Sequence, residues 1–296
     1  MAPLSYQNIW NSPLDKSNWS SIETIQKYSD GSVFAGGYRQ GSQYGANDTS
    51  GYLARYSSDG DIIWEREIGT DQYDEILDIE LSLDGYIYAT GTSLGKLASE
   101  TNKGDSDGFL IKYDLFGNEV WRTTFGSAGT DEPYSIAIDK TNTVYVGGYT
   151  RGDLNGYRNS GAEDGFVLKY DNNGKLLWTK TFGSSSSEEI SGVKVGKDGA
   201  IYASGTEEIE TSTSFSTNII LYRLSPSGDT YWSQKISDGY NQGMNISDNG
   251  IISILDSGKA TRIIEVDANG NTATSSLPGI NTYQARAIAL ANSNDY

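Results

Sequence analysis

Tryptophan recurs along this chain at a nearly constant interval. The five positions are Trp10, Trp64, Trp121, Trp178 and Trp232, which are separated by 54, 57, 57 and 54 residues. Each ends a similar segment, and the clearest copies are GFLIKYDLFGNEVWRTTFG at Gly108–Gly126 and GFVLKYDNNGKLLWTKTFG at Gly165–Gly183. A looser copy occupies Gly51–Gly69. A fixed period of this length is typical of stacked supersecondary units, so the sequence predicts a repeat protein.

Each repeat contains four short segments with the composition of β-strands. In the third copy they are Tyr134–Asp139, Val144–Thr150, Gly165–Asp171 and Lys175–Phe182. All four are rich in β-branched and aromatic residues, and Gly, Asn and Asp separate them. No segment shows sustained helical periodicity with caps. Four antiparallel strands per unit, repeated around a ring, predict an all-β fold of the β-propeller class.

The repeat resembles a bacterial β-propeller repeat, the SBBP type. Its pattern runs roughly D-A-F-V-x-K-Y-D-x-x-G-x-x-x-W, followed after acidic residues by G-I-A-x-D-x-x-G-x-x-Y-V-x-G-Y-T. Asp164–Gly183 matches the first half, and Asp131–Thr150 (DEPYSIAIDKTNTVYVGGYT) matches the second. The resemblance is strong over residues 51–206 and weak after Pro226. It implies the propeller fold and carries no catalytic signature.

Five complete blades are expected within residues 20–277. Two segments are left over, an outer strand at Leu4–Asn11 and an inner strand at Gln284–Ala291. We expect residues 1–19 and 278–296 to help close the ring or dock on a neighbour. The alternative is a six-bladed ring with an incomplete last blade. No linker divides the chain, so residues 1–296 are expected to form a single domain.

Composition narrows the choice of function. With 22 basic and 39 acidic residues the net charge is −17, which argues against nucleic acid as a partner. No apolar stretch is long enough to span a membrane, and the N-terminus lacks the features of a secretory signal. Histidine and cysteine are absent, which leaves carboxylates as the acid–base groups of any enzyme. The compartment stays open, with an extracellular or virion location favoured.

The tryptophans are expected to be structural. A large apolar ring at the end of each repeat suits contact between neighbouring blades better than a ligand pocket. We therefore expect the tryptophans to be buried where one blade meets the next.

Acidic pairs begin three of the inner strands, one period apart. They are Asp74-Glu75, Asp131-Glu132 and Glu188-Glu189. Inner strands line the channel of a propeller, so the pairs could gather at one mouth and bind a divalent cation such as Ca²⁺. The alternative is that they are solvated loop acids that bond to backbone N–H groups. No other cofactor is expected.

Long connections between second and third strands are expected on one face. They are Arg39–Ser50, Ser93–Asp107, Arg151–Asp164 and Glu207–Asn218. Such loops on a rigid scaffold commonly carry function. The candidate partner-binding residues are Tyr44, Arg151, Tyr157 and Arg158, because Tyr and Arg are enriched at binding hot spots.

Three functions remain compatible with the sequence. The first is an interaction, adhesion or structural module without enzymatic activity, such as a subunit of a virion or cell-surface assembly, with another protein or a surface glycan as partner. The second is a glycan-binding lectin. The third is a glycosidase or lyase that uses carboxylates. The first is preferred because no catalytic residue set is visible.

Overall fold

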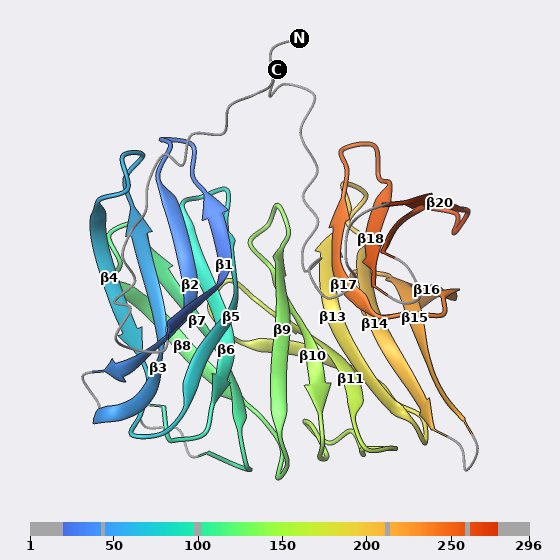
Figure 1. Cartoon of the computed structure of the whole chain (residues 1–296), viewed down its shortest axis with the longest axis horizontal. Helices are drawn as coiled ribbons and strands as arrows, with labels where there is room; N and C mark the ends of the chain where they lie inside the picture. Colours follow the sequence, from blue (N-terminus) through green and yellow to red (C-terminus); the bar gives the residue numbers. More distant parts are fainter. Residues whose placement is uncertain (1–19, 43–44, 98–101, 211–213, 258–260, 278–296) are drawn as a thin grey trace. The chain divides into compact units, whose positions relative to one another are not determined.

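The computed structural model describes residues 20–42, 45–97, 102–210, 214–257 and 261–277. These residues form twenty β-strands, and no helix occurs among them (Figure 1). The strands make five antiparallel sheets of four, each in chain order, which confirms an all-β propeller fold with five blades. The segments 4–11 and 284–291, expected as extra strands, lie outside the described residues.

The strands recur along the chain at the interval that the tryptophans mark. The first two blades contain β1 (Ser20–Lys27), β2 (Val33–Ser42), β3 (Gly45–Tyr56), β4 (Ile62–Ile68), β5 (Asp74–Leu81), β6 (Tyr86–Ser93), β7 (Asp107–Asp114) and β8 (Glu119–Phe125). The other three contain β9 (Asp131–Ile138), β10 (Val144–Thr150), β11 (Asp164–Tyr170), β12 (Leu176–Phe182), β13 (Ser187–Val195), β14 (Ile201–Glu210), β15 (Phe215–Leu224), β16 (Thr230–Ser237), β17 (Asn241–Ile246), β18 (Ile252–Asp256), β19 (Arg262–Val266) and β20 (Thr272–Ser276).

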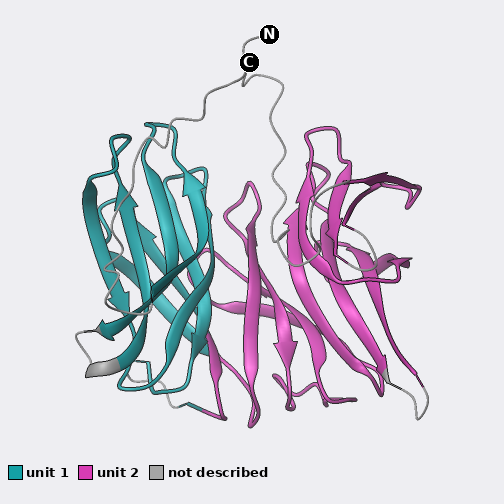
Figure 2. Ribbon diagram, in the orientation of Figure 1, with its two compact units in different colours: residues 1–102, 109–124 teal, residues 103–108, 125–296 magenta. Residues whose placement is uncertain are grey.

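The strands divide between two compact units, shown in Figure 2. The first comprises residues 1–102 and 109–124, and the second comprises residues 103–108 and 125–296. The core of the first unit contains Phe34, Trp64 and Phe109. The second unit has one core cluster around Val167 and Val193 and another around Leu221, Ile254 and Ile264. The expected single domain stays a prediction.

An aspartate and a glycine shape the turn between the third and fourth strands. In the third blade, Oδ1 of Asp171 accepts hydrogen bonds from the backbone N–H of Asn173 (2.8 Å) and Lys175 (2.9 Å). Gly174 has φ of 79°, a conformation that a side chain disfavours. Asp267 caps the turn of the fifth blade in the same way. This explains the Y-D-x-x-G pattern of the repeat.

Other glycines permit close approach of the backbone. A Cβ atom at Gly148 of β10 would lie 2.0 Å from the carbonyl oxygen of Glu132, where the register between β9 and β10 shifts. A Cβ atom at Gly205 of β14 would lie 1.7 Å from the carbonyl oxygen of Glu189. These glycines let the inner strand bulge just after its acidic pair, and the bulge fixes where the pair lies.

The tryptophans connect consecutive blades through their indole N–H groups. Nε1 donates to a carbonyl oxygen in the third-to-fourth-strand turn of the next blade: Trp64 to Leu115 (2.9 Å), Trp178 to Pro226 (3.2 Å) and Trp232 to Ala268 (3.3 Å). Trp64 is buried, with 9% of its surface exposed. Trp121, Trp178 and Trp232 are only partly buried. The expectation that all of these tryptophans are buried is therefore wrong for Trp121, Trp178 and Trp232.

Two of the four expected long loops are strands. Residues 39–50 belong mostly to β2 and β3, with Arg39 paired to Ser50. Residues 207–218 belong mostly to β14 and β15, with Glu210 paired to Phe215. Thr, Ser and Ile in these segments extend the antiparallel pairing beyond the repeat consensus. The described residues 94–97 and 102–106, and the segment 151–163, lie outside the strands, as expected for loops.

Candidate functional site

The first acid of each pair is buried and closes a loop. Asp74 accepts hydrogen bonds from N (2.6 Å) and Oγ1 (2.9 Å) of Thr70. Oδ2 of Asp131 accepts the equivalent bonds from N (2.6 Å) and Oγ (2.9 Å) of Ser127. Glu188 accepts a bond from N of Ser184 (3.0 Å) and another from its hydroxyl. The first acids thus bond to backbone N–H groups, as the alternative interpretation of the sequence expected, but they are buried loop caps and not solvated.

The second acids occupy a more polar environment. In the first unit, the hydroxyl of Tyr73 donates to Glu75 (2.7 Å). In the second unit, the hydroxyl of Tyr134 donates to Glu132 (3.3 Å), and the rings of Tyr134 and Tyr149 pack together with centroids 5.6 Å apart. Burial and the charge of Glu132 raise the pKa of both phenols, so they stay protonated donors.

The second acid of the third pair, Glu189, has a strongly raised pKa. Burial raises the pKa of Glu189 to about 7, and the charges of Glu163, Glu208 and Glu132 add to the shift. A carboxyl group that is half protonated near neutral pH, beside other carboxylates, can serve as a general acid or base. We name this group of second-unit residues the Glu189 cluster: Glu132, Tyr134, Tyr149, Glu163, Glu189 and Glu208.

In the described part of the chain, no three acidic residues form a group that could hold a metal ion. Cation binding by the acidic pairs therefore stays a prediction. Glu163 is not among the residues predicted from the sequence, although it directly precedes Asp164 of the repeat motif. Glu163 accepts a hydrogen bond from the hydroxyl of Ser187 (2.6 Å) and forms an ion pair with Arg151 (2.6 Å).

The β10–β11 loop, residues 151–163, is the best-defined candidate for partner binding. Leu154 is fully buried and anchors it, and Asn155 and Gly156 turn the chain with φ of 51° and 87°. Tyr157 is 49% exposed and Arg158 is exposed beside it.

Hydrogen bonds at its C-terminal end tie this loop to the sheet. Nδ2 of Asn159 donates to the carbonyl oxygen of Thr150 (3.0 Å), and the N–H of Ser160 donates to the carboxylate of Asp164 (3.0 Å). Of the four expected contact residues, Arg151 is engaged by Glu163, and Tyr157 and Arg158 are presented outward. Tyr44 lies outside the described residues.

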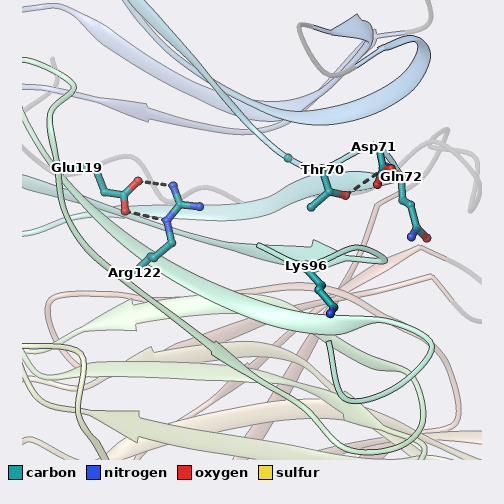
Figure 3. Close-up of a pocket in the computed structure, with 7 residues that line it drawn as sticks. Thr70, Asp71, Gln72, Lys96, Glu119 and Arg122 are labelled. Carbon is teal, nitrogen blue, oxygen red and sulfur yellow. Dashed lines mark hydrogen bonds and ion pairs between the residues drawn. The ribbon is translucent and has the colours of Figure 1, made fainter. Parts of the chain in front are cut away.

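An open depression of about 790 Å³ lies on the first unit (Figure 3). Its lining carries both charges: Lys96 and Arg122 against Asp71 and Glu119. Glu119 and Arg122 form an ion pair with each other, with Nε of Arg122 2.7 Å from Oε1 of Glu119. The balanced charge gives no preference for a cationic or anionic ligand, so this depression is a weaker candidate than the loop.

Comparison with known proteins places the chain among the β-propellers. Residues 120–155 match the family model described as the SBBP beta-propeller repeat, which confirms the resemblance seen in the sequence. In the described residues, no helix is long and apolar enough to cross a membrane. The five-bladed sheet arrangement and this repeat are both consistent with a protein-interaction module.

Two relatives match about half of the chain. Regulatory protein FlaEY of Caulobacter vibrioides is 26% identical over 158 residues, which is 48% of this chain and 17% of the relative. An uncharacterized WD repeat-containing protein of Acanthamoeba polyphaga mimivirus, L264, is 25% identical over 185 residues, which is 49% of this chain and 13% of the relative. The matches thus cover a small part of each relative's own length.

Solved structures with a similar fold include two glycosidases. An α-L-arabinanase of Penicillium chrysogenum, complexed with arabinobiose, aligns with a TM-score of 0.58 over 88% of this chain and 81% of its own, at 10% identity. The GH93 α-L-arabinofuranosidase of Fusarium graminearum aligns with a TM-score of 0.56 over 89% of this chain and 86% of its own, also at 10% identity.

These glycosidases correct the prediction that the chain is not an enzyme. That prediction, drawn from the lack of a visible catalytic set, is wrong because propellers of the same fold include enzymes. At 10% identity the likeness shows the fold alone, and no active-site residue can be transferred from it.

Proposed function

We propose that this protein is a β-propeller interaction module that binds a partner protein through the β10–β11 loop. The observation that carries the proposal is the presentation of Tyr157 and Arg158 on a loop held by the buried Leu154. A loop already fixed before binding loses little conformational entropy in the complex. Exposed Tyr and Arg supply the contacts that contribute most to binding energy at protein interfaces. Membership of a virion or cell-surface assembly stays a prediction.

The proposal is tested by capture from extracts of the source organism with three immobilised forms of the whole chain. The forms are the unchanged protein, Tyr157→Ala/Arg158→Ala and the control Leu83→Ala, whose side chain is 88% exposed in a different turn. We expect a protein that is recovered by the first and third forms and falls at least tenfold with the second. Equal recovery by all three forms would reject the loop as the binding surface. Binding lost after glycan removal from the extract would make the partner a surface glycan.

A second candidate function is glycoside hydrolysis at the Glu189 cluster. The observation that favours it is the raised pKa of Glu189, about 7, beside the other carboxylates. Arabinan oligosaccharides are the first substrates to assay, because arabinan-cleaving propellers share the fold. Hydrolysis that is abolished by Glu189→Gln and retained by Glu265→Gln, an exposed glutamate of β19, would support this candidate. Absence of hydrolysis would remove it.

A further inference from the structure

Buried oxygen atoms without hydrogen-bond partners collect at two equivalent places in the repeat. Among the described residues seven buried side-chain oxygens lack a partner, and only the hydroxyl of Tyr88 lies elsewhere. Six belong to residues at the start of the third strand of one blade or in the first two strands of the next: Asp48, Ser50 and Thr92 in the first unit, and Ser106, Asp107 and Asp131 in the second. Such atoms are costly unless water or an ion satisfies them.

The second of these places, which we name the Asp107 junction, has a defined frame. Ser106 and Thr130 form a parallel bridge, and the N–H of Asp131 donates to the carbonyl oxygen of Ser106 (3.0 Å). Oδ2 of Asp107 accepts a hydrogen bond from N of Lys103 (2.8 Å). Since Oδ2 of Asp131 accepts the bonds from Ser127, each carboxylate is held by one oxygen and leaves Oδ1 without a partner.

The two carboxylates are deeply buried and influence each other. Asp107 is 4% exposed, Asp131 is 0% exposed and Ser106 is 5% exposed. Burial raises the pKa of Asp107 and of Asp131, and the charge of Asp131 raises the pKa of Asp107 further. The charge of Lys103 lowers the pKa of both carboxyl groups, and the hydroxyl of Thr150 lowers that of Asp131, so the burial effect is only partly offset. Two nearby buried carboxylates need a proton or a cation between them, because their mutual repulsion is poorly screened.

At the equivalent place between the third and fourth blades, which we call the third junction, the oxygens of both carboxylates have hydrogen-bond partners. Asp164 is equivalent to Asp107 in the repeat, and both of its oxygens accept a hydrogen bond from N of Ser160 (3.2 and 3.0 Å). Glu188 is equivalent to Asp131, and both of its oxygens accept bonds from Ser184. The unpartnered oxygens at the Asp107 junction are therefore not a general property of the repeat.

We propose that the Asp107 junction binds a Ca²⁺ ion through Oδ1 of Asp107, Oδ1 of Asp131 and the hydroxyl of Ser106. Ca²⁺ prefers carboxylate, hydroxyl and carbonyl oxygens and accepts irregular coordination completed by water. Soft transition metals prefer imidazole and thiolate, and the sequence contains neither histidine nor cysteine. The ion would fix the Lys103–Gly108 segment that leads into β7. This inference does not depend on the proposed partner binding.

The test is calorimetric titration of the chelator-treated whole chain with CaCl₂, with MgCl₂ as a comparison. We expect one Ca²⁺ per chain with a dissociation constant between about 10⁻⁵ and 10⁻³ M, within the range of known calcium sites. Asp107→Asn and Asp131→Asn should each weaken binding at least tenfold. The matched control Asp164→Asn, at the satisfied third junction, should leave the affinity unchanged. Mg²⁺ should bind more weakly than Ca²⁺.

Two results would overturn the proposal. The first is no heat of binding up to about 10 mM Ca²⁺, well above the weakest known extracellular sites. The second is unchanged affinity in Asp107→Asn.

Discussion

A Cβ atom at Gly183 would lie 2.2 Å from Oδ2 of Asp164, nineteen positions earlier in the chain. The glycine that ends the outer strand therefore leaves room for the acid that begins the third strand. Gly126 and Asp107 have the same relationship in the preceding repeat, also at 2.2 Å. This pairing explains why D-G-F at one end of the segment always accompanies a glycine after the tryptophan.

The first prediction concerns this pairing. Gly183→Ala should lower the free energy of unfolding by about 1–3 kcal/mol, the usual cost of overpacking. Combining it with Asp164→Ala should recover most of the loss caused by the glycine change, because the clashing carboxylate is gone. The measurement is urea unfolding of both single variants and the double variant. Strictly additive effects would show that the two residues do not interact.

The second prediction concerns the tryptophans. Trp64→Ala should lower the free energy of unfolding by about 3–5 kcal/mol, because it removes a buried ring. Trp178→Phe keeps an aromatic ring and loses the bond to Pro226, so it should cost only about 1 kcal/mol. Urea unfolding followed by circular dichroism measures both. Equal losses would mean that the N–H bond, not the ring, dominates.

The third prediction is a pH dependence set by Glu189. The folded pKa of about 7 lies above the ordinary glutamate value of 4.5, so folding favours the protonated form. The stabilisation from this group is therefore complete below pH 4.5 and is lost as pH rises through 7. Glu189→Gln should raise the melting temperature at pH 8 and change it little at pH 4.5.

The control for this pH effect is Glu265→Gln. Glu265 is exposed in β19, so its substitution should leave the pH profile of the melting temperature unchanged. A profile for Glu189→Gln that ran parallel to that of the unchanged protein would contradict the assignment.

The fourth prediction concerns the β10–β11 loop. Leu154→Ala should loosen residues 151–163 while β10 and β11 stay folded, because Leu154 anchors the loop. Hydrogen exchange should show faster exchange at Asn159 and Gly161, whose N–H groups bond to Asp153 and Asn159. Unchanged exchange rates at these two amides would show that the hydrogen bonds alone hold the loop.

The repeat made the fold predictable from the sequence. The environment of each single acidic residue could not be predicted in the same way. Trp178 and its equivalents fixed the phase of the first four blades, and the Y-D-x-x-G turns fixed the hairpins. The sequence did not distinguish the buried cap Asp131 from its neighbour Glu132. Successive side chains along a strand point to opposite faces of the sheet, and the sequence alone does not show which of these faces is buried. The strand extension at Glu210 was missed because it departs from the repeat consensus and depends on pairing with Phe215.

The hydrogen bonds of the indole N–H groups described above all run in one direction along the chain, from one blade to the next. Trp64, Trp178 and Trp232 each supply the donor, and the following blade supplies the acceptor, as with Trp232 and Ala268. Loss of the last blade would therefore leave an indole N–H and a ring face without their cover. Loss of the first blade would leave the carbonyl of Leu115, which water can satisfy, and would also uncover the apolar side chains of Ile76 and Ile79 that pack in the core with Phe34. Shortening this protein from its C-terminal side should thus leave an unpaired donor, whereas shortening it from the other side should leave an unpaired acceptor.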